Sequence, residues 1–225
     1  MATLTPQLVL LRHGETEWSR SGQHTGRTDL SLTSDGEAQA VAAGRFITRH
    51  TSLRGRPFAQ IRTSPLVRAQ RTAELAGFPG AQLDANLMEW DYGQVEGRTS
   101  LEVSDDVGHD WQIFRDGVRD GASPRAGAPA PPTSSTSPTS PGETLADVAT
   151  RATRVIDDVA EVLDGGGDVL LVAHGHLLRV LGALWLGLNP TYGARLVLGT
   201  AATCLLGTEH DQRILDGWNL RSWGL

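Results

Sequence analysis

Two apolar runs in this chain each end at a histidine that is followed by glycine. The first run, LVLLRHG, ends at His13, and the second, VLLVAHG, ends at His174. Each run has the length of one strand buried on both faces of a parallel sheet. Side chains at the carboxyl ends of neighbouring strands line the ligand crevice of an open α/β sheet. The pattern therefore predicts that the two imidazoles converge at one edge of a sheet, where glycine lets the backbone approach closely.

Helical patterns alternate with these strands. A long polar loop follows the first strand, and Ser34 or Asp35 is expected to cap the helix after it. After a short segment at 57–64, Ser64 is expected to cap a helix that Gly77 ends. The expected helices cover residues 37–50, 65–77, 110–116, 142–164 and 176–188, and residues 194–210 are expected to form one or two further strands.

This alternation predicts an α/β fold with a mainly parallel sheet flanked by helices on both faces. A chain of 225 residues is long enough for one such domain, which we expect to span 1–225. Residues 121–142, GASPRAGAPAPPTSSTSPTSPG, contain six of the eleven prolines and cannot form a packed core. We interpret them as a Pro/Ser/Thr-rich low-complexity insertion, a small cap within the single domain, because the chain that follows is too short to fold alone.

Composition excludes several classes of function. The net charge of −6 argues against nucleic acid or an anionic membrane as a partner. No apolar stretch reaches the roughly 18–20 residues of a membrane span, and the start MATLTPQLVLL lacks the basic region of a signal peptide, so we expect a cytoplasmic protein. All 20 basic residues are arginine, which excludes Schiff-base chemistry, the P-loop lysine and Ser–Lys hydrolases. Cys204 is the only cysteine, which excludes internal disulfides and CxxC sites.

The residue before the first histidine adds a charge to the site. Arg12 directly precedes His13, so the pair is a candidate nucleophile with a phosphate clamp. The planar fork of arginine suits phosphate recognition. No cluster of Asp, Glu or His has the spacing of metal ligands, so we expect neither a metal nor a cofactor.

Four motifs resemble, in order and spacing, the histidine phosphatase superfamily, also called the phosphoglycerate-mutase-like family. They are LLRHGETEW, TSPLVRAQRTA, LMEWDYGQVEG and VAHGHLLR, and the resemblance runs from about residue 8 to residue 190. Within the family, WSRSGQHTGRTDL, EWDYG, FRDG and AHGHLLR look most like the sedoheptulose-bisphosphatase branch and actinobacterial acid phosphatases.

The resemblance implies a nucleophile and its phosphate clamp. His13 matches the residue whose ring nitrogen attacks phosphorus and forms a phosphohistidine, and a neutral imidazole is available for this around neutral pH. Arg12 and Arg68 match the clamp arginines, and His174 completes the pocket. Together these groups would offset charge on the equatorial oxygens, a largely electrostatic form of catalysis.

The resemblance also implies a general acid. Glu89 matches the carboxyl that protonates the leaving alkoxide and then activates water, and a carboxyl beside a phosphate dianion keeps its proton more readily. Asp91 would share a face with Glu89 in an extended segment, so spacing alone does not choose between them. The family register favours Glu89, and Glu15 is a weaker candidate.

Further positions match groups that contact phosphate and substrate in similar enzymes. Ser64 is expected to cap its helix, with a bond to the catalytic histidine as the alternative, and His176 is expected beside the site or at the surface. Ser19 stands where many relatives carry asparagine. The phosphate- and substrate-binding residues implied by the resemblance are Ser19, Gln23, His24, Thr25, Gly26, Tyr92 and Arg179.

The segment after the expected acid separates hydrolysis from transfer. A mutase holds a bisphosphate and needs extra cationic groups above its pocket, whereas Trp90 and Asp91 follow Glu89 here and residues 121–142 offer only Arg125. We therefore expect a metal-independent phosphomonoesterase that acts on small phosphorylated metabolites, with sugar phosphates favoured. A cofactor-dependent phosphoglycerate mutase and a protein phosphatase are the alternatives.

Overall fold

The strand that carries His13 lies inside a six-stranded sheet with the order β3-β2-β4-β1-β5-β6. The structure, a computed structural model, describes residues 5–52, 57–118 and 140–221. Strands β1 to β4 pair in parallel, while β5 is antiparallel to β1 and β6 is antiparallel to β5, so the expected mainly parallel sheet is confirmed. The strands are β1 (Leu8–Arg12), β2 (Phe58–Thr63), β3 (Gln82–Leu83), β4 (Asp168–Ala173), β5 (Thr203–Glu209) and β6 (Gln212–Leu220).

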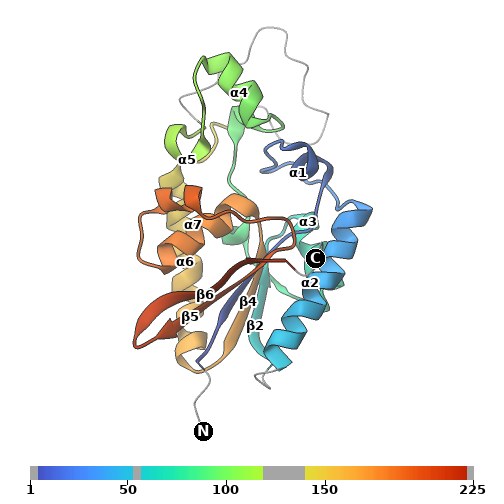
Figure 1. Cartoon of the computed structure of the whole chain (residues 1–225), viewed down its shortest axis with the longest axis vertical. Coiled ribbons are helices and arrows are strands. Elements are labelled where there is room, and N and C mark those ends of the chain that lie inside the picture. Colours follow the sequence, from blue (N-terminus) through green and yellow to red (C-terminus); the bar gives the residue numbers. More distant parts are fainter. Residues whose placement is uncertain (1–4, 53–56, 119–139, 222–225) are drawn as a thin grey trace.

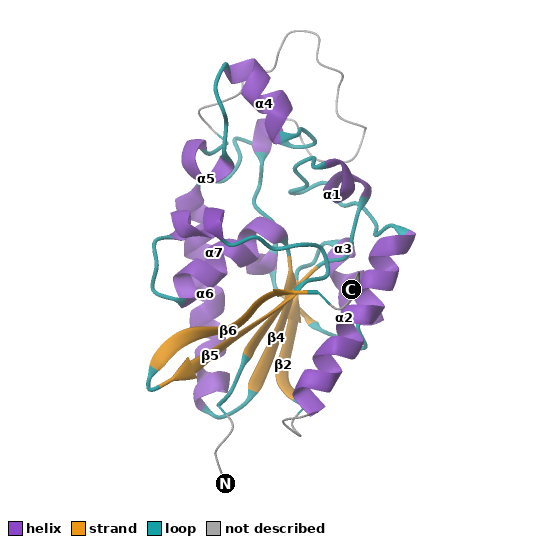
Figure 2. Ribbon diagram, viewed as in Figure 1, coloured by secondary structure: helices purple, strands orange, loops and turns teal. Residues whose placement is uncertain are grey.

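Helices cover both faces of this sheet (Figures 1 and 2). Leu8 and Leu10 belong to one hydrophobic cluster with α6 (Leu145–Asp164) and α7 (Gly175–Trp185). Val9 and Leu11 belong to a second cluster with α2 (Ser34–Ser52) and α3 (Val67–Leu75). Both faces of β1 are therefore buried, which explains why its sequence is continuously apolar rather than alternating.

The register of β1 and β4 places the two histidines side by side. Arg12 pairs with Ala173 at the carboxyl ends of the two strands. One residue further, the backbone N–H of His13 donates to the carbonyl of Ala173 at 2.9 Å. His13 and His174 therefore leave the sheet at the same level, as the sequence pattern predicts.

Shorter helices lie beyond the carboxyl ends of the parallel strands, in the upper half of Figure 1. Two of them, α1 and α4, were not expected, and both begin with a capping box, at Thr16–Ser19 and at Thr99–Glu102. The T-x-x-E pattern at Thr99 is the signal that would have predicted α4. The short helices are α1 (Glu17–Ser21), α4 (Ser100–Val107), α5 (Ile113–Asp116) and the 3₁₀ helices η1 (Ala85–Leu87), η2 (Gly93–Val95) and η3 (Pro190–Arg195).

Two boundaries differ from expectation. The cap of α2 is Thr33, whose Oγ1 accepts from the N–H of Gly36 at 3.0 Å, because the helix begins at Ser34 itself. The expectation that Ser34 or Asp35 is the cap is therefore wrong. Within 194–210 only β5 is a strand, and β6 after it forms a hairpin whose turn holds His210 and Asp211 at φ 48° and 61°.

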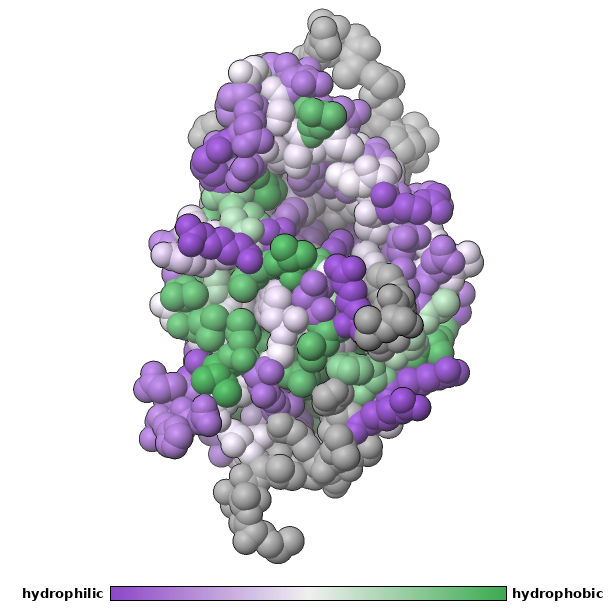
Figure 3. Space-filling view, viewed as in Figure 1, coloured by the Kyte–Doolittle hydropathy of each residue, from purple (hydrophilic) through white to green (hydrophobic). Residues whose placement is uncertain are grey.

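Most of the Pro/Ser/Thr-rich segment expected as an insertion at 121–142 lies outside the described residues. Its last three residues are described, and Ser140 Oγ donates to Asp91 Oδ2 at 2.7 Å. Among the described helices, none is both long and apolar enough to cross a membrane. Apolar surface gathers over the region of α7, β5 and β6 in Figure 3. Leu188, Tyr192 and Val197 are among the exposed large hydrophobic side chains.

Candidate active site

The imidazoles of His13 and His174 face each other at the carboxyl ends of β1 and β4. Their ring centroids lie 5.1 Å apart, and only 3% and 0% of the two residues are exposed. Both rings are thus held inside the protein next to each other, although 160 residues separate them in the sequence. The expected convergence is observed.

One hydrogen bond decides which nitrogen of His13 is available. Nδ1 lies 2.7 Å from the carbonyl oxygen of Gly14, which can only accept, so Nδ1 carries the hydrogen and Nε2 keeps its lone pair. Burial, followed by the charges of Arg68 and Arg12, lowers the pKa of His13 well below its usual 6.5. The ring is therefore neutral near pH 7, the form that a nucleophilic imidazole needs.

His174 is also neutral, but its hydrogen is on the other ring nitrogen, Nε2. Its Nδ1 accepts from Arg68 Nε at 3.2 Å, so its Nε2 carries the hydrogen and donates to Ser64 Oγ at 2.8 Å. Burial and then the charge of Arg68 lower the pKa of His174 well below 6.5. The expected capping role of Ser64 is wrong, because α3 begins only at Val67 with Leu66 as its N-cap. Ser64 instead orients His174, which was the alternative expectation for this serine.

The two expected clamp arginines both reach the histidine pair. Arg68 is fully buried, and besides His174 it binds the carbonyls of Thr25, Gly26 and Thr28 at 2.9–3.0 Å. Arg12 Nη1 donates to the carbonyl of Leu198 at 2.6 Å. Its Nε is buried and has no hydrogen-bond partner among the described residues, so it is a donor that a phosphate oxygen can satisfy.

A glycine makes room for the first of these arginines. A Cβ at Gly175, the first residue of α7, would lie 3.2 Å from the guanidinium carbon of Arg12. The second histidine is thus followed by glycine because the Arg12 side chain packs against the start of α7.

Glu89 reaches the same place from the segment between η1 and η2. Its carboxylate accepts from the N–H groups of His176 and Leu177, at 3.0 and 2.9 Å, in the first turn of α7. It therefore occupies the N-cap site that His174, the residue before α7, leaves without a side-chain bond. Burial lowers the pKa values of Arg12 and Arg68, and the charge of Glu89 opposes this lowering.

The other two candidate carboxylates bind loops instead. Asp91 accepts from the N–H of Gly93 at 3.0 Å and from Ser140, while Glu15 accepts from Thr33 Oγ1 at 2.9 Å. The geometry therefore favours Glu89 over both alternatives.

The residues expected to bind substrate fall into two groups. Ser19 is engaged in the capping box of α1, and Gln23 Nε2 donates to the carbonyl of Gly97, in the segment after η2, at 2.7 Å. Thr25 and Gly26 face the site through the carbonyls that bind Arg68.

The second group of expected binding residues forms an aromatic cluster. The ring of His24 lies 4.9 Å from Tyr92, whose hydroxyl is hydrogen bonded to His176 Nδ1. The guanidinium of Arg179 lies 4.8 Å from the ring centroid of Phe114. Burial lowers the pKa of His176 well below 6.5, with further lowering by Arg179 and His24. His176 therefore lies beside the site, half-buried, rather than at the surface.

One residue that no sequence motif singled out supports the loop bound to Arg68. Glu96 is mostly buried, and it accepts from the N–H groups of Gly26 and Thr28 at 2.9 and 3.0 Å. Glu96 therefore binds the N–H groups of the same loop whose carbonyl groups bind Arg68. Burial raises its pKa, although the hydrogen bonds with Thr28 and Gly26 oppose the rise.

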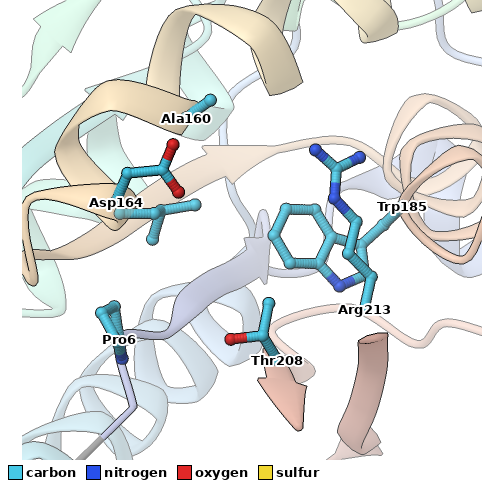
Figure 4. A pocket seen from close by; sticks show the side chains of 7 residues that line it. Pro6, Ala160, Asp164, Trp185, Thr208 and Arg213 are labelled. Carbon is cyan, nitrogen blue, oxygen red and sulfur yellow. The ribbon is translucent and has the colours of Figure 1, made fainter. Parts of the chain in front are cut away.

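A small pocket elsewhere contains none of these residues. Figure 4 shows its lining, with the cation–π pair of Arg213 and Trp185 on one side. It also includes Pro6, which precedes β1, so it lies at the amino-terminal end of that strand. The histidines are at the opposite end.

Known proteins with similar sequences and folds share this arrangement of elements. The model of the histidine phosphatase superfamily (branch 1) matches residues 8–221. The chain is 34% identical over 215 residues to an acid phosphatase of Mycobacterium tuberculosis, covering 96% of this chain and 93% of that protein. It is 33% identical over 212 residues to sedoheptulose 1,7-bisphosphatase of Saccharomyces cerevisiae, covering 84% and 70%. The solved structure of an open reading frame of M. tuberculosis superposes with a TM-score of 0.81 at 32% identity, covering 97% and 100%.

Proposed function

The chain belongs to branch 1 of the histidine phosphatase superfamily, and from this premise we propose a phosphomonoesterase that hydrolyses small phosphorylated metabolites through a phosphohistidine. The observation that carries the proposal is the state of His13, a neutral ring with Nε2 unprotonated beside two arginines. The acid phosphatase and the sugar bisphosphatase among its relatives support the same reaction class.

In the first step, Nε2 of His13 attacks phosphorus and the bond from phosphorus to the ester oxygen breaks. The positive guanidinium groups of Arg12 and Arg68 flank the transferring group and offset the charge on its equatorial oxygens, while the neutral ring of His174 completes the pocket. This positive charge comes from protein side chains, so we propose that no metal takes part. Dialysis against EDTA is expected to leave turnover unchanged, and a loss that magnesium or zinc restores would contradict the mechanism.

Glu89 supplies the proton that the leaving alkoxide needs. In the second step its carboxylate takes a proton from water, the resulting hydroxide attacks phosphorus, and the bond between phosphorus and His13 breaks. Inorganic phosphate is released and His13 returns to the neutral state.

The decisive experiment traps the intermediate. Quenching the wild type with labelled substrate in alkaline detergent is expected to trap a base-stable, acid-labile phosphoenzyme, and His13→Ala is expected to yield none while remaining folded. Equal labelling of the variant would remove the assignment of His13.

Substrate class is the finer part of the proposal. We propose sugar phosphates, since a sugar bisphosphatase aligns over 84% of this chain. The motif resemblance also matches Tyr92 and Arg179 to substrate-contacting positions of that branch. A metabolite panel tests this beside a phosphopeptide panel. A coupled phosphoglycerate assay with bisphosphate primer tests the mutase alternative. A cytoplasmic location and the absence of nucleic-acid partners stay predictions from composition.

A further inference from the structure

Arg151 on α6 has a hydrogen-bond acceptor for each of its five N–H groups. Nε and Nη2 bind the two carboxylate oxygens of Glu143 at 2.8 and 3.0 Å. Nη2 also donates to the carbonyl of Glu89 at 3.1 Å, and Nη1 donates to the carbonyls of Asn86 and Met88. The residue is 8% exposed, so these bonds are made inside the protein. Only the planar fork of arginine can satisfy such a set.

Glu143 holds the other side of the same segment. Its carboxylate accepts from the N–H of Asp91 at 2.9 Å, and its own N–H donates to the carbonyl of Asp91 at 2.9 Å. Its carbonyl accepts from the indole N–H of Trp90 at 2.7 Å. The two residues together therefore bind the main chain of 86–91 on both sides of Glu89.

Among the described residues, the backbone around Glu89 has no strand partner that could hold it. Residues 86–91 comprise the end of η1 and the segment that leads to η2, and they lie outside the sheet. The carboxylate of Glu89 accepts hydrogen bonds from the first turn of α7. These bonds require the main chain at Glu89 to keep a fixed position relative to that helix. Arg151 and Glu143 provide this restraint from the N-terminal part of α6 and the residues just before it.

We propose that Arg151, with Glu143, is a positioning residue for the general acid, acting on catalysis through the main chain of residues 86–91 without touching substrate. The proposal rests on the proposed function, in which Glu89 protonates the leaving group. It predicts that disturbing Arg151 impairs proton donation more than phosphate binding.

The test is Arg151→Lys, which keeps the charge and removes the fork. The kcat for glycerol 2-phosphate is expected to fall by about 10²-fold, because a displaced acid no longer meets the alkoxide. The burst rate with p-nitrophenyl phosphate should change far less, since nitrophenol leaves without a proton. KM and the affinity for vanadate are expected to stay unchanged. Arg154→Lys, on the exposed side of the same helix, is the matched control and should change none of these values.

The double variant Arg151→Lys/Glu89→Gln separates positioning from general support of the fold. Once Glu89 cannot donate a proton, the Arg151 change is expected to cause no further loss with glycerol 2-phosphate. A full additional loss in the double variant, or an equal loss on both substrates in the single variant, would overturn the proposal.

Two further measurements keep the outcome decisive. If Arg151→Lys does not fold, Glu143→Gln takes its place, with a smaller loss of the same substrate selectivity expected. Absence of that selectivity counts against the proposal. If the phosphoenzyme trap succeeds and Glu89→Gln is selective while the Arg151 and Glu143 variants are not, only the positioning role fails. If no phosphohistidine forms, the proposed function itself fails.

Discussion

At the residue scale, single hydrogen bonds decide the chemical state of each candidate group. The Gly14 carbonyl leaves Nε2 of His13 unprotonated, whereas Arg68 and Ser64 occupy both nitrogens of His174. The two neighbouring imidazoles are therefore not interchangeable. One can form a bond to phosphorus, and the other is held as part of the surrounding charge and hydrogen-bond pattern.

The assignment of the acid can be tested with two conservative substitutions. Glu89→Gln is expected to slow alkyl phosphates by roughly 10²–10⁴-fold. It should slow the release of nitrophenol from p-nitrophenyl phosphate much less, so a burst should precede a slow steady state limited by hydrolysis of the phosphohistidine. Asp91→Asn is expected to show neither effect. The reverse behaviour of the two variants would move the acid to Asp91, and no discrimination by either would make Glu15 the next candidate.

Ser64→Ala tests the corrected role of that serine. The change leaves Nε2–H of His174 buried without its acceptor, which costs about 1–3 kcal/mol of unfolding free energy. Urea unfolding measures the loss, and kcat is expected to fall because the ring is no longer oriented. Thr63→Val, a buried neighbour with an isosteric replacement, is the control and should cost less. Equal losses would mean that Ser64 only packs.

At the element scale, the loop after β1 and the start of α2 touch through their backbones. A Cβ at Gly36 would lie 2.1 Å from the carbonyl oxygen of Glu15, and one at Gly14 would lie 2.3 Å from that of Gly36. No side chain fits between these segments. Helix α2 therefore rests directly on the loop that begins at the candidate nucleophile.

Gly36→Ala is expected to destabilise the protein although alanine favours helix. The gain in helix propensity is about 1 kcal/mol, and the forced separation of the two segments costs about 1–3 kcal/mol and displaces His13. We expect lower stability in chemical denaturation together with lower kcat/KM. Gly207→Ala in β5, where the nearest atom lies 4.0 Å from the new Cβ, should change neither. A neutral Gly36→Ala would mean that the two segments separate without cost.

The sequence predicted those elements whose pattern is long or fully apolar. β1, β4, α6 and α7 carry such patterns, and their positions are confirmed. Helix α1 has only five residues and depends on its capping box, so a polar loop was expected there. β6 alternates imperfectly and pairs with β5 through two register shifts, which hides the period of two that marks a strand.

At the scale of the whole molecule, four histidines link folding to pH. Burial is the largest cause that lowers the pKa values of His13, His24, His174 and His176. Between their folded pKa values and about 6.5, the unfolded chain binds more protons than the folded one, so stability rises with pH. The contribution of Glu96 to the pH dependence of stability has the opposite sign, because its raised pKa lets the folded state bind the extra proton. Glu96 therefore offsets part of the rise of stability with pH that the histidines cause.

We therefore expect the unfolding free energy to fall as pH decreases from about 6.5 towards 5, and to change little between 7.5 and 8.5. Each histidine contributes up to about 1.4 kcal/mol per pH unit in its window. His24→Asn is expected to reduce the slope of the unfolding free energy against pH, between about 5 and 6.5, by about the contribution of one histidine. Urea unfolding at a series of pH values measures this. An unchanged slope in the variant would show that His24 does not stay neutral in the fold.

Most of the candidate site could be expected from the resemblance of four motifs, because those motifs carry the candidate reacting groups themselves. Arg151 and Glu96 could not be expected, since they bind main-chain atoms of segments 62 or more residues away. A backbone carbonyl has no sequence signature, and only the fold brings it to a guanidinium. The prediction that Ser64 caps a helix was wrong for a related reason. A serine before a proline fits a helix cap as well as it fits a hydrogen bond to a distant histidine.

The pairing of β1 with β4 has a consequence for how proteins of this design diversify. The two imidazoles stand 5.1 Å apart, close to the ~4.8 Å between neighbouring strands of any sheet. Their separation is thus a property of backbone hydrogen bonding, which substitutions of side chains leave untouched. Loops beyond the strand ends can be lengthened, shortened or exchanged over evolutionary time without altering it. A lineage built on this sheet can therefore acquire new substrates while its reaction stays the same.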